Sequence, residues 1–196
     1  MKSMRTIADQ SAGIPLLADD VIEFHAARLL LLAHLCGKKD RIDGLTKMAK
    51  LDFFVRYPQF FAKACRYLNP DATSTNEAHH GSDAVESSMI RYHYGPWDQR
   101  YYQVLAYMRS RGLLDVEQEG RSYKLRLTAA GRAAAATLAS DSAFATLVEQ
   151  MRRVKSVFGN MTGTRLKELV YEVFDQEVAQ RAKGEVITDD DQDAYY

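Results

Sequence analysis

Residues 92–132 read YHYGPWDQRYYQVLAYMRSRGLLDVEQEGRSYKLRLTAAGR, and they predict a helix, a tight β-hairpin and the start of a second helix. Pro96 suits the first turn of the first helix, where its missing N–H group is not needed. Gly112 is expected to end that helix. Five apolar residues between these two points fall on one helical face, namely Trp97, Tyr101, Val104, Leu105 and Met108.

Two short strands, residues 113–118 and 121–127, follow the helix and are joined by a two-residue turn at Glu119 and Gly120. Thr128 then suits the N-cap of the next helix. The register places apolar residues on one face of the hairpin and charges on the other, which a slip of one residue would reverse. The predicted cross-strand pairs are Val116 with Tyr123, Leu114 with Leu125 and Asp115 with Lys124.

The run Gly112-Leu113-Leu114, the charged hairpin and the sequence LTAAGR at 127–132 together resemble the wing of winged-helix proteins such as MarR-type and PadR-type regulators. The resemblance implies a mainly α fold with a small β-hairpin, in which a winged-helix-like core is followed by additional C-terminal helices. A wing of this kind specifies a fold far better than a function.

Further helices are predicted before this region. Residues 21–37 are apolar around much of their circumference, which predicts a central helix capped by Asp19 or Asp20. KKDRID at 38–43 is expected to be a polar connection. Gly44 opens the next helix, and Pro58 separates it from another. A long polar loop, residues 69–88, then leads to a strand at 89–94 that alternates apolar and basic residues.

The C-terminal part is expected to contain three more helices, which begin at Thr128, at Ser140 or Asp141, and at Thr162 or Thr164. Together these patterns predict one domain over residues 19–175. An N-terminal segment of residues 1–18 precedes this domain, and an acidic, flexible tail of residues 176–196 follows it.

Composition restricts the classes of function. The chain has 196 residues, 46% of them hydrophobic, and a formal net charge of zero. Neutrality counts against a general polyanion binder, although a local basic patch is compatible with it. The start MKSMRTIADQSAG lacks the apolar core of a signal peptide, and the most apolar run, residues 26–36, is too short to span a bilayer. These features predict a cytoplasmic protein without membrane contact.

No residue pattern predicts catalysis, a metal or a cofactor. His25 and His34 are nine positions apart on a helix, and no Cys or carboxylate completes a metal-binding set around either. Phosphate-binding glycine loops, nucleophile elbows and HExxH motifs do not occur in the sequence. Cys36 and Cys65 lie in apolar helical patterns and are predicted to be buried, reduced thiols. We therefore expect a protein that is not an enzyme.

Basic residues concentrate around the hairpin, where seven Lys or Arg accompany three acidic residues between Arg100 and Arg132. A basic helix and wing are typical of contact with DNA phosphates. The alternative is a solvated face, because Asp115 would cancel Lys124 and two glutamates lie near the hairpin tip. The residues predicted to contact DNA or a partner are Lys47, Lys50, Arg100, Arg109, Arg111, Arg121, Lys124 and Arg126.

Two other groups of residues have alternative interpretations. Arg152, Arg153 and Lys155 form a second basic set, which is more often a solvated helix face than a partner site. The aromatic residues around Trp97 and Tyr102 favour either core packing or a protein-binding surface, since Tyr and Trp are enriched at interfaces.

Four sequence patterns, taken in their order along the chain, resemble those of a second family. They are GLTKMAKLDFFVRYP, ESSMIRYHYGPWDQRYYQVLAYMRSRGLL, YKLRLTAAGR and GTRLKELVYEVF. In this order they are similar to the small middle component of bacterial ABC-three-component and Lamassu-like anti-phage defence systems. The resemblance spans about Asp20 to Phe174. It implies a non-catalytic accessory subunit that binds an SMC-like ATPase and helps it sense or hold DNA, while a separate effector such as a nuclease causes the damage.

Two other functions remain open. A MarR/PadR-like transcriptional regulator would explain the hairpin and its local positive charge, and it would require a symmetric dimer. An enzyme would have to be built on His79 and His80 in the polar loop, where ordinary solvation is the simpler interpretation. The segment between Pro58 and the strand at 89–94 departs from a simple winged helix, and this insertion favours protein partners.

Overall fold

The computed structural model of the chain describes residues 21–70, 89–92 and 95–174. The sequence predictions for residues 1–18, for residues 71–88 of the polar loop and for the tail at 176–196 lie outside the described residues.

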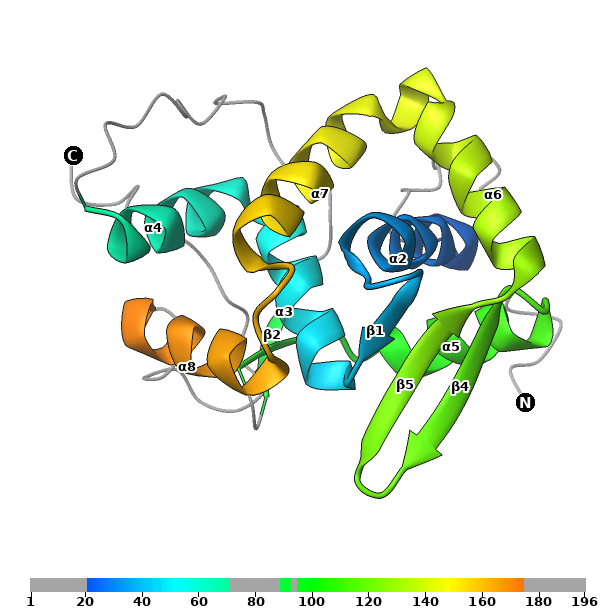
Figure 1. Ribbon diagram of the computed structural model, residues 1–196, viewed down its shortest axis with the longest axis horizontal. Coiled ribbons are helices and arrows are strands. Elements are labelled where there is room, and N and C mark those ends of the chain that lie inside the picture. The colour runs from blue at the N-terminus through cyan, green and yellow to red at the C-terminus, as the bar shows by residue number, and fades with distance from the viewer. Residues whose placement is uncertain (1–20, 71–88, 93–94, 175–196) are drawn as a thin grey trace, which may run out of the picture.

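The fold is mainly α with a small antiparallel sheet, as the sequence predicts (Figure 1). The helices are α2 (Ile22–Cys36), α3 (Leu45–Arg56), α4 (Pro58–Leu68), α5 (Tyr101–Ser110), α6 (Ala129–Ser140), α7 (Ala145–Phe158) and α8 (Gly163–Val173), with a 3-10 turn η2 (Ser142–Phe144). The strands are β1 (Arg41–Asp43), β2 (Ile90–Tyr92), β3 (Gly95–Trp97), β4 (Leu114–Glu119) and β5 (Ser122–Leu127).

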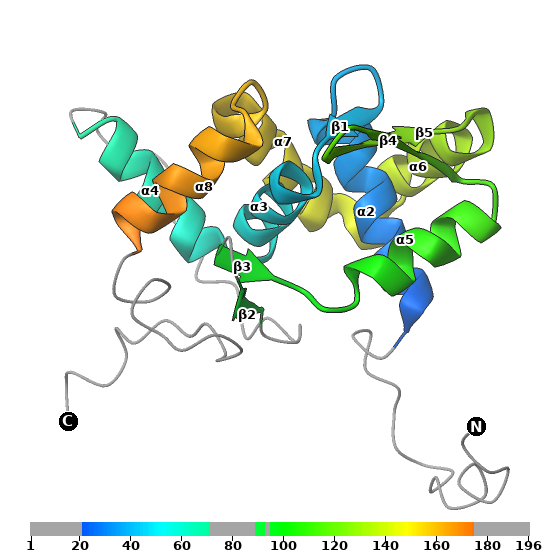
Figure 2. The ribbon, with the colours of Figure 1, turned by 90° about the horizontal axis from the view of Figure 1, so that it is seen from below.

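Helices α2 and α3 form the centre of the protein. Every residue of α2 from Arg28 to Ala33 is buried, because α5, α6 and α7 pack around it. Every residue of α3 from Met48 to Arg56 is buried too, beneath α4, α7 and α8. Figure 2 shows α4 and α8 side by side, away from the wing formed by β4 and β5. The order α2, α3, α5 and wing is that of the predicted winged-helix-like core, with α4, β2 and β3 inserted before α5.

The hairpin is confirmed, but the predicted turn is wrong by one position. The turn residues are Gly120 and Arg121, and the observed pairs include Leu114 with Leu127, Val116 with Leu125 and Asp115 with Arg126. Gly120 has φ +59° at the first turn position, where a type II′ turn requires a positive φ. Because each pairing moves by two residues, every side chain stays on its predicted face of the hairpin.

The sequence KKDRID is not only a polar connection, because residues 41–43 form β1 and extend the wing to three strands in the order β1-β5-β4. Ile42 lies opposite Leu125, and both side chains are buried. The turn before β1 has positive φ at Lys39 (53°) and Asp40 (55°). The main chain of this turn is fixed where Leu127 N–H donates to Asp40 O at 3.0 Å.

The first helix of the 92–132 stretch starts later than predicted. Pro96 lies in β3, which pairs with the predicted strand, so that Trp97 is opposite Ile90. Helix α5 begins only at Tyr101, with Arg100 as its N-cap, and the backbone turn before it is closed where Asp98 O accepts Tyr101 N–H at 3.2 Å. The prediction that Pro96 occupies the first helical turn was therefore wrong.

The other predicted helix ends agree well with the structure. Thr128 Oγ1 accepts Gly131 N–H at 3.0 Å, and Thr162 Oγ1 accepts Arg165 N–H at 3.1 Å. Pro58 opens α4 as predicted. Two starts differ from the prediction. The N-cap of α2 is Val21 rather than Asp19 or Asp20, and Asp141 caps the 3-10 turn η2, so that α7 itself begins only at Ala145. Among the described helices, none is both long and apolar enough to cross a bilayer.

Candidate functional site: the exposed face of α5

Helix α5 presents one exposed face, which we call the α5 face. Its residues are Tyr102, Gln103, Ala106, Arg109 and Ser110. The opposite side of the helix packs Tyr101, Val104, Leu105 and Met108 into the core. Among the described residues, only Tyr102 and Tyr67 are large hydrophobic side chains that are exposed, at 62% and 51%. Tyr102 is therefore the most exposed large hydrophobic side chain in the part of the chain that the structure describes.

One aromatic neighbour of Tyr102 is Trp97. The Trp97 ring lies 5.8 Å from the Tyr102 ring and meets the Tyr101 ring edge-on at 5.1 Å. Further along α5, the Arg111 guanidinium lies 5.2 Å from the centre of the Tyr107 ring. Tyr, Trp and Arg are the residues that contribute most to the affinity of protein interfaces.

A buried ionic network fixes the position of α5. We give this name to the contacts of Arg28, Asp52, Arg56, Asp98 and Arg100. Arg28 Nε donates to Asp52 Oδ1 at 2.9 Å, which joins α2 to α3. Tyr101 OH donates to Asp52 Oδ2 at 2.7 Å, which joins α5 to α3. Three helices are thus held by one carboxylate whose side chain is not exposed.

Asp98 forms the second centre of the network. Arg56 Nη1 donates to Asp98 Oδ2 at 3.0 Å, and Arg100 Nη2 donates to the same oxygen at 2.8 Å. Arg100 Nη1 also donates to His25 Nε2 at 3.0 Å. Burial alone would raise the pKa of Asp98, but hydrogen bonds from Arg100 and the charge of Arg56 outweigh it and hold that pKa well below its ordinary value. The Asp98 carboxylate is therefore charged at neutral pH.

Three of the predicted contact residues are engaged inside the protein. Arg100 belongs to the network, where it binds Asp98 and His25. Lys50 is 1% exposed, and its Nζ donates to Pro96 O at 2.8 Å. Lys47 Nζ donates to Gly159 O at 2.9 Å, at the end of α7. Because Lys50 is buried, the structure does not place this predicted contact residue on a surface that DNA or a partner could reach.

The wing carries its own counter-charges. Lys124 forms an ion pair with Glu119, and it lies opposite Glu117 in the register. Arg126 is exposed, but it lies opposite Asp115. The outer face of the hairpin therefore pairs basic residues with acidic ones, as the solvated-face alternative predicts.

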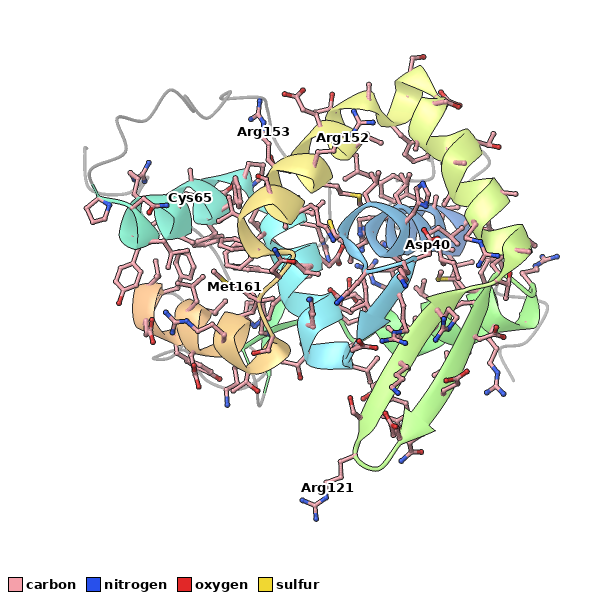
Figure 3. The ribbon with its side chains drawn as sticks, in the orientation of Figure 1. Asp40, Cys65, Arg121, Arg152, Arg153 and Met161 are labelled. Carbon is pink, nitrogen blue, oxygen red and sulfur yellow. The ribbon has the colours of Figure 1, made fainter. Side chains whose placement is uncertain are left out.

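The remaining predicted cations lie at opposite ends of the hairpin. Arg121 points into solvent at the tip (Figure 3), whereas Arg109 and Arg111 lie next to the base. Strands of six residues separate the two ends by about 20 Å. The structure therefore does not gather the eight predicted residues into one patch.

The described residues contain no group of three His, Cys, Asp or Glu side chains that could hold a metal ion. Cys36 is buried, and desolvation raises the pKa of its thiol to about 12. Sequence reasoning did not single out Lys38 and Lys39, in the turn between α2 and β1, and it did not connect them with Lys155, whose Nζ donates to Cys36 O and Gly37 O just before this turn. Comparisons of the chain with protein-family models, with curated proteins and with solved structures found no match.

Proposed function

We propose that this protein is a non-catalytic accessory subunit of a cytoplasmic anti-phage defence complex, and that it binds an SMC-like ATPase through the α5 face. A separate effector such as a nuclease supplies the damage, and the complex senses or holds DNA. The order of the four sequence patterns between Asp20 and Phe174 supports the assignment to this family. The α5 face is the surface to which we propose that the ATPase binds.

The observation that carries the proposal is the exposed Tyr102 on α5, which lies next to the half-buried Trp97 of β3. Tyr102 is 62% exposed, and its ring lies 5.8 Å from that of Trp97. A rigid aromatic anchor loses little conformational entropy on binding, which is why such residues dominate interface affinity. The ionic network beneath α5 supplies the rigidity.

The surroundings of α5 favour a protein over a DNA groove as its partner. In a helix-turn-helix protein, the N-terminal residues of the recognition helix reach the base edges. At this end of α5, Arg100 is held by Asp98 and His25, and β3 lies directly before the helix. The cation best placed to contact phosphate is therefore already engaged.

The test is an affinity purification of the tagged full-length protein, expressed together with its native gene neighbours. The proposal predicts that a large coiled-coil ATPase co-elutes in a fixed molar ratio, which mass spectrometry would identify. Recovery of this chain alone, as a dimer, would instead support a transcriptional regulator.

A winged-helix regulator of the MarR or PadR type is the second candidate. The chain order of α2, α3, α5 and wing favours it, as do the exposed Arg109, Arg111 and Arg121. Changing Arg109 and Arg111 together to Ala should then weaken duplex binding strongly and reduce its salt dependence. A monomeric protein with no affinity for promoter DNA would exclude this candidate.

A further inference from the structure

The neutrality of the chain conceals a separation of charge. The described residues contain 22 of the 26 Lys and Arg but only 12 of the 26 Asp and Glu, which gives them a formal charge of +10. The other residues carry the remaining 4 basic and 14 acidic side chains, and so a charge of −10. The part of the chain that the structure describes is therefore strongly basic, and like charges on it repel unless an anion lies close by.

Part of this positive charge gathers in what we call the lysine cluster, Lys38, Lys39, Lys47 and Lys155. Lys155 Nζ donates to Cys36 O at 3.0 Å and to Gly37 O at 2.9 Å, so it sits at the end of α2. Burial, followed by the charge of Lys155, lowers the pKa of Lys47; the charge of Asp43 opposes this effect, and the charge of Lys38 adds a smaller contribution to it. The lysines are thus close enough to disfavour one another.

Two acidic residues lie near the cluster, and each also has another partner. Asp40 Oδ1 is 2.7 Å from His34 Nδ1, and Asp43 Oδ1 is 2.8 Å from Arg41 Nε. Arg152, one helical turn before Lys155, adds a further exposed cation on α7 (Figure 3). The described residues therefore leave the lysine cluster with an excess of positive charge.

The turn that carries Lys38 and Lys39 is held in a conformation that L-residues rarely adopt. Lys39 and Asp40 both have positive φ, and a Lys gains nothing locally from this backbone. Hydrogen bonds from Lys38 N–H to Arg41 O (2.8 Å) and from Leu127 N–H to Asp40 O (3.0 Å) keep the turn in place. The two lysines are consequently presented by a fixed backbone, and backbone strain of this kind is concentrated at functional sites.

We propose that the acidic C-terminal segment of this chain, residues 185–196, docks on the lysine cluster and shields it from other polyanions. The segment reads EVITDDDQDAYY and carries five acidic residues without any Lys or Arg. Its charge thus complements that of the cluster.

The length of chain after α8 allows this contact. Helix α8 starts beside the cluster, where an added Cβ on Gly163 would lie 3.0 Å from Lys47 N. The helix carries the chain about 16 Å away over its 11 residues. Residues 175–184 can then span up to about 33 Å, which is enough to return.

The docking surface is separate from the α5 face. The turn between α2 and β1 and helix α5 lie on opposite sides of the protein (Figure 2). Variants in the lysine cluster therefore test the tail without touching the surface proposed for the ATPase, so the two proposals can fail independently.

The experiment measures binding of a fluorescent peptide of sequence EVITDDDQDAYY to full-length chains. One chain is wild type, and in the other the tail is neutralised by Glu185→Gln, Asp189→Asn, Asp190→Asn, Asp191→Asn and Asp193→Asn. Because a tethered tail acts at high effective concentration, the peptide should bind the neutralised chain at least about tenfold more tightly than wild type. Equal affinity for the two chains, or binding to neither, would overturn the proposal.

Two further variants of the neutralised chain locate the site. Lys38→Gln with Lys39→Asn should lower the peptide affinity at least about tenfold, because screening at moderate salt still leaves neighbouring charges coupled. Asn tolerates positive φ, so this change removes charge without adding strain. The matched control, Arg121→Gln with Arg126→Gln, removes the same charge from the wing and should have little effect.

Equal losses in the two double variants would show non-specific attraction and contradict the proposed site. A short DNA duplex supplies the other decisive outcome. If the duplex bound wild-type and tail-neutralised chains equally, and did so through Lys38 and Lys39, the cluster would belong to nucleic acid rather than to the tail.

Discussion

Arg28 and Asp52 form an ion pair at the centre of the protein, with Arg28 Nε 2.9 Å from Asp52 Oδ1 and both side chains at most 1% exposed. Residues 24 positions apart are thereby joined across α2 and α3. Tyr101 OH donates to the other oxygen of the same carboxylate, so α5 is held by the pair as well. The orientation of the α5 face therefore depends on a charge that has no access to water.

Removing Arg28 should strongly destabilise the protein. Arg28→Met leaves the Asp52 carboxylate buried without its strongest partner, and breaking one side of a buried pair costs about 3–5 kcal/mol. Urea unfolding followed by circular dichroism measures the free energy of unfolding. The control is Arg153→Ala, which breaks a surface pair with Glu149 and should change that free energy by less than about 1 kcal/mol. If the two variants lowered the free energy of unfolding equally, the buried Arg28–Asp52 pair would contribute no more to stability than a surface pair.

Lys50 should make stability depend on pH. Desolvation lowers its pKa from 10.5 to about 7 in the folded protein. Between these values the unfolded chain binds a proton that the folded chain does not, so stability decreases as the pH falls towards 7. The slope is about 1.4 kcal/mol per pH unit at most, and it disappears below pH 7, where Lys50 is charged in both states.

The measurement compares the free energies of unfolding of wild type and Lys50→Met between about pH 7 and 10. Because Met has no ionisable group, the difference between the two proteins should shift in favour of Lys50→Met as the pH decreases. Parallel pH profiles would contradict the burial of an uncharged Lys50.

Gly131 should tolerate no side chain. An added Cβ would lie 2.0 Å from Leu113 O, a backbone atom at the base of the hairpin. Gly131→Ala should therefore force α6 away from β4 and lower the free energy of unfolding by at least about 2 kcal/mol. Ala130→Ser, at the exposed neighbouring position, should change it by less than about 0.5 kcal/mol. If Gly131→Ala and Ala130→Ser had the same melting temperature, the close approach of Gly131 to the Leu113 carbonyl would be ruled out.

The two thiols should differ in reactivity. Cys36 is fully buried, its Sγ donates to Met151 O at 3.3 Å and its pKa is raised to about 12, so it should react with a thiol reagent only when the protein unfolds. Cys65 is half-buried, and burial raises its pKa by less, so it should react first. A chromogenic disulfide reagent resolves the two phases, and Cys65→Ser should remove the faster one. A fast phase that persists in Cys65→Ser would place Cys36 at the surface.

Local patterns predicted most of the elements. Helical periodicity located α2, α3 and α7, and the alternation around Gly120 located the hairpin and the correct face of every side chain. The turn was misplaced because a glycine suits either position of a two-residue turn, and only the observed φ distinguishes them. Strand β1 was missed because a strand of three residues has one inward side chain, here Ile42, and no detectable period.

The site was less predictable, since charge on a sequence does not reveal its partners. Lys50 and Arg100 look like surface cations, yet one donates to the Pro96 carbonyl and the other binds a carboxylate inside the fold. The separation of charge between the described residues and the rest was hidden by the neutral total. Trp97 and Tyr102 were recognised as candidates for an interface, but exposure distinguished Tyr102 from the buried Tyr101 beside it.

The most direct measurement of the central proposal is the amount of SMC-like ATPase that co-purifies with Tyr102→Ala. Removing a central aromatic anchor costs about 2 kcal/mol or more, so the affinity should fall about 30-fold and most of the ATPase should be lost. Tyr67→Ala is the matched control, because Tyr67 is similarly exposed on α4 and should retain the ATPase at the wild-type ratio. Equal recovery with both variants, or loss only with Tyr67→Ala, would contradict binding through the α5 face.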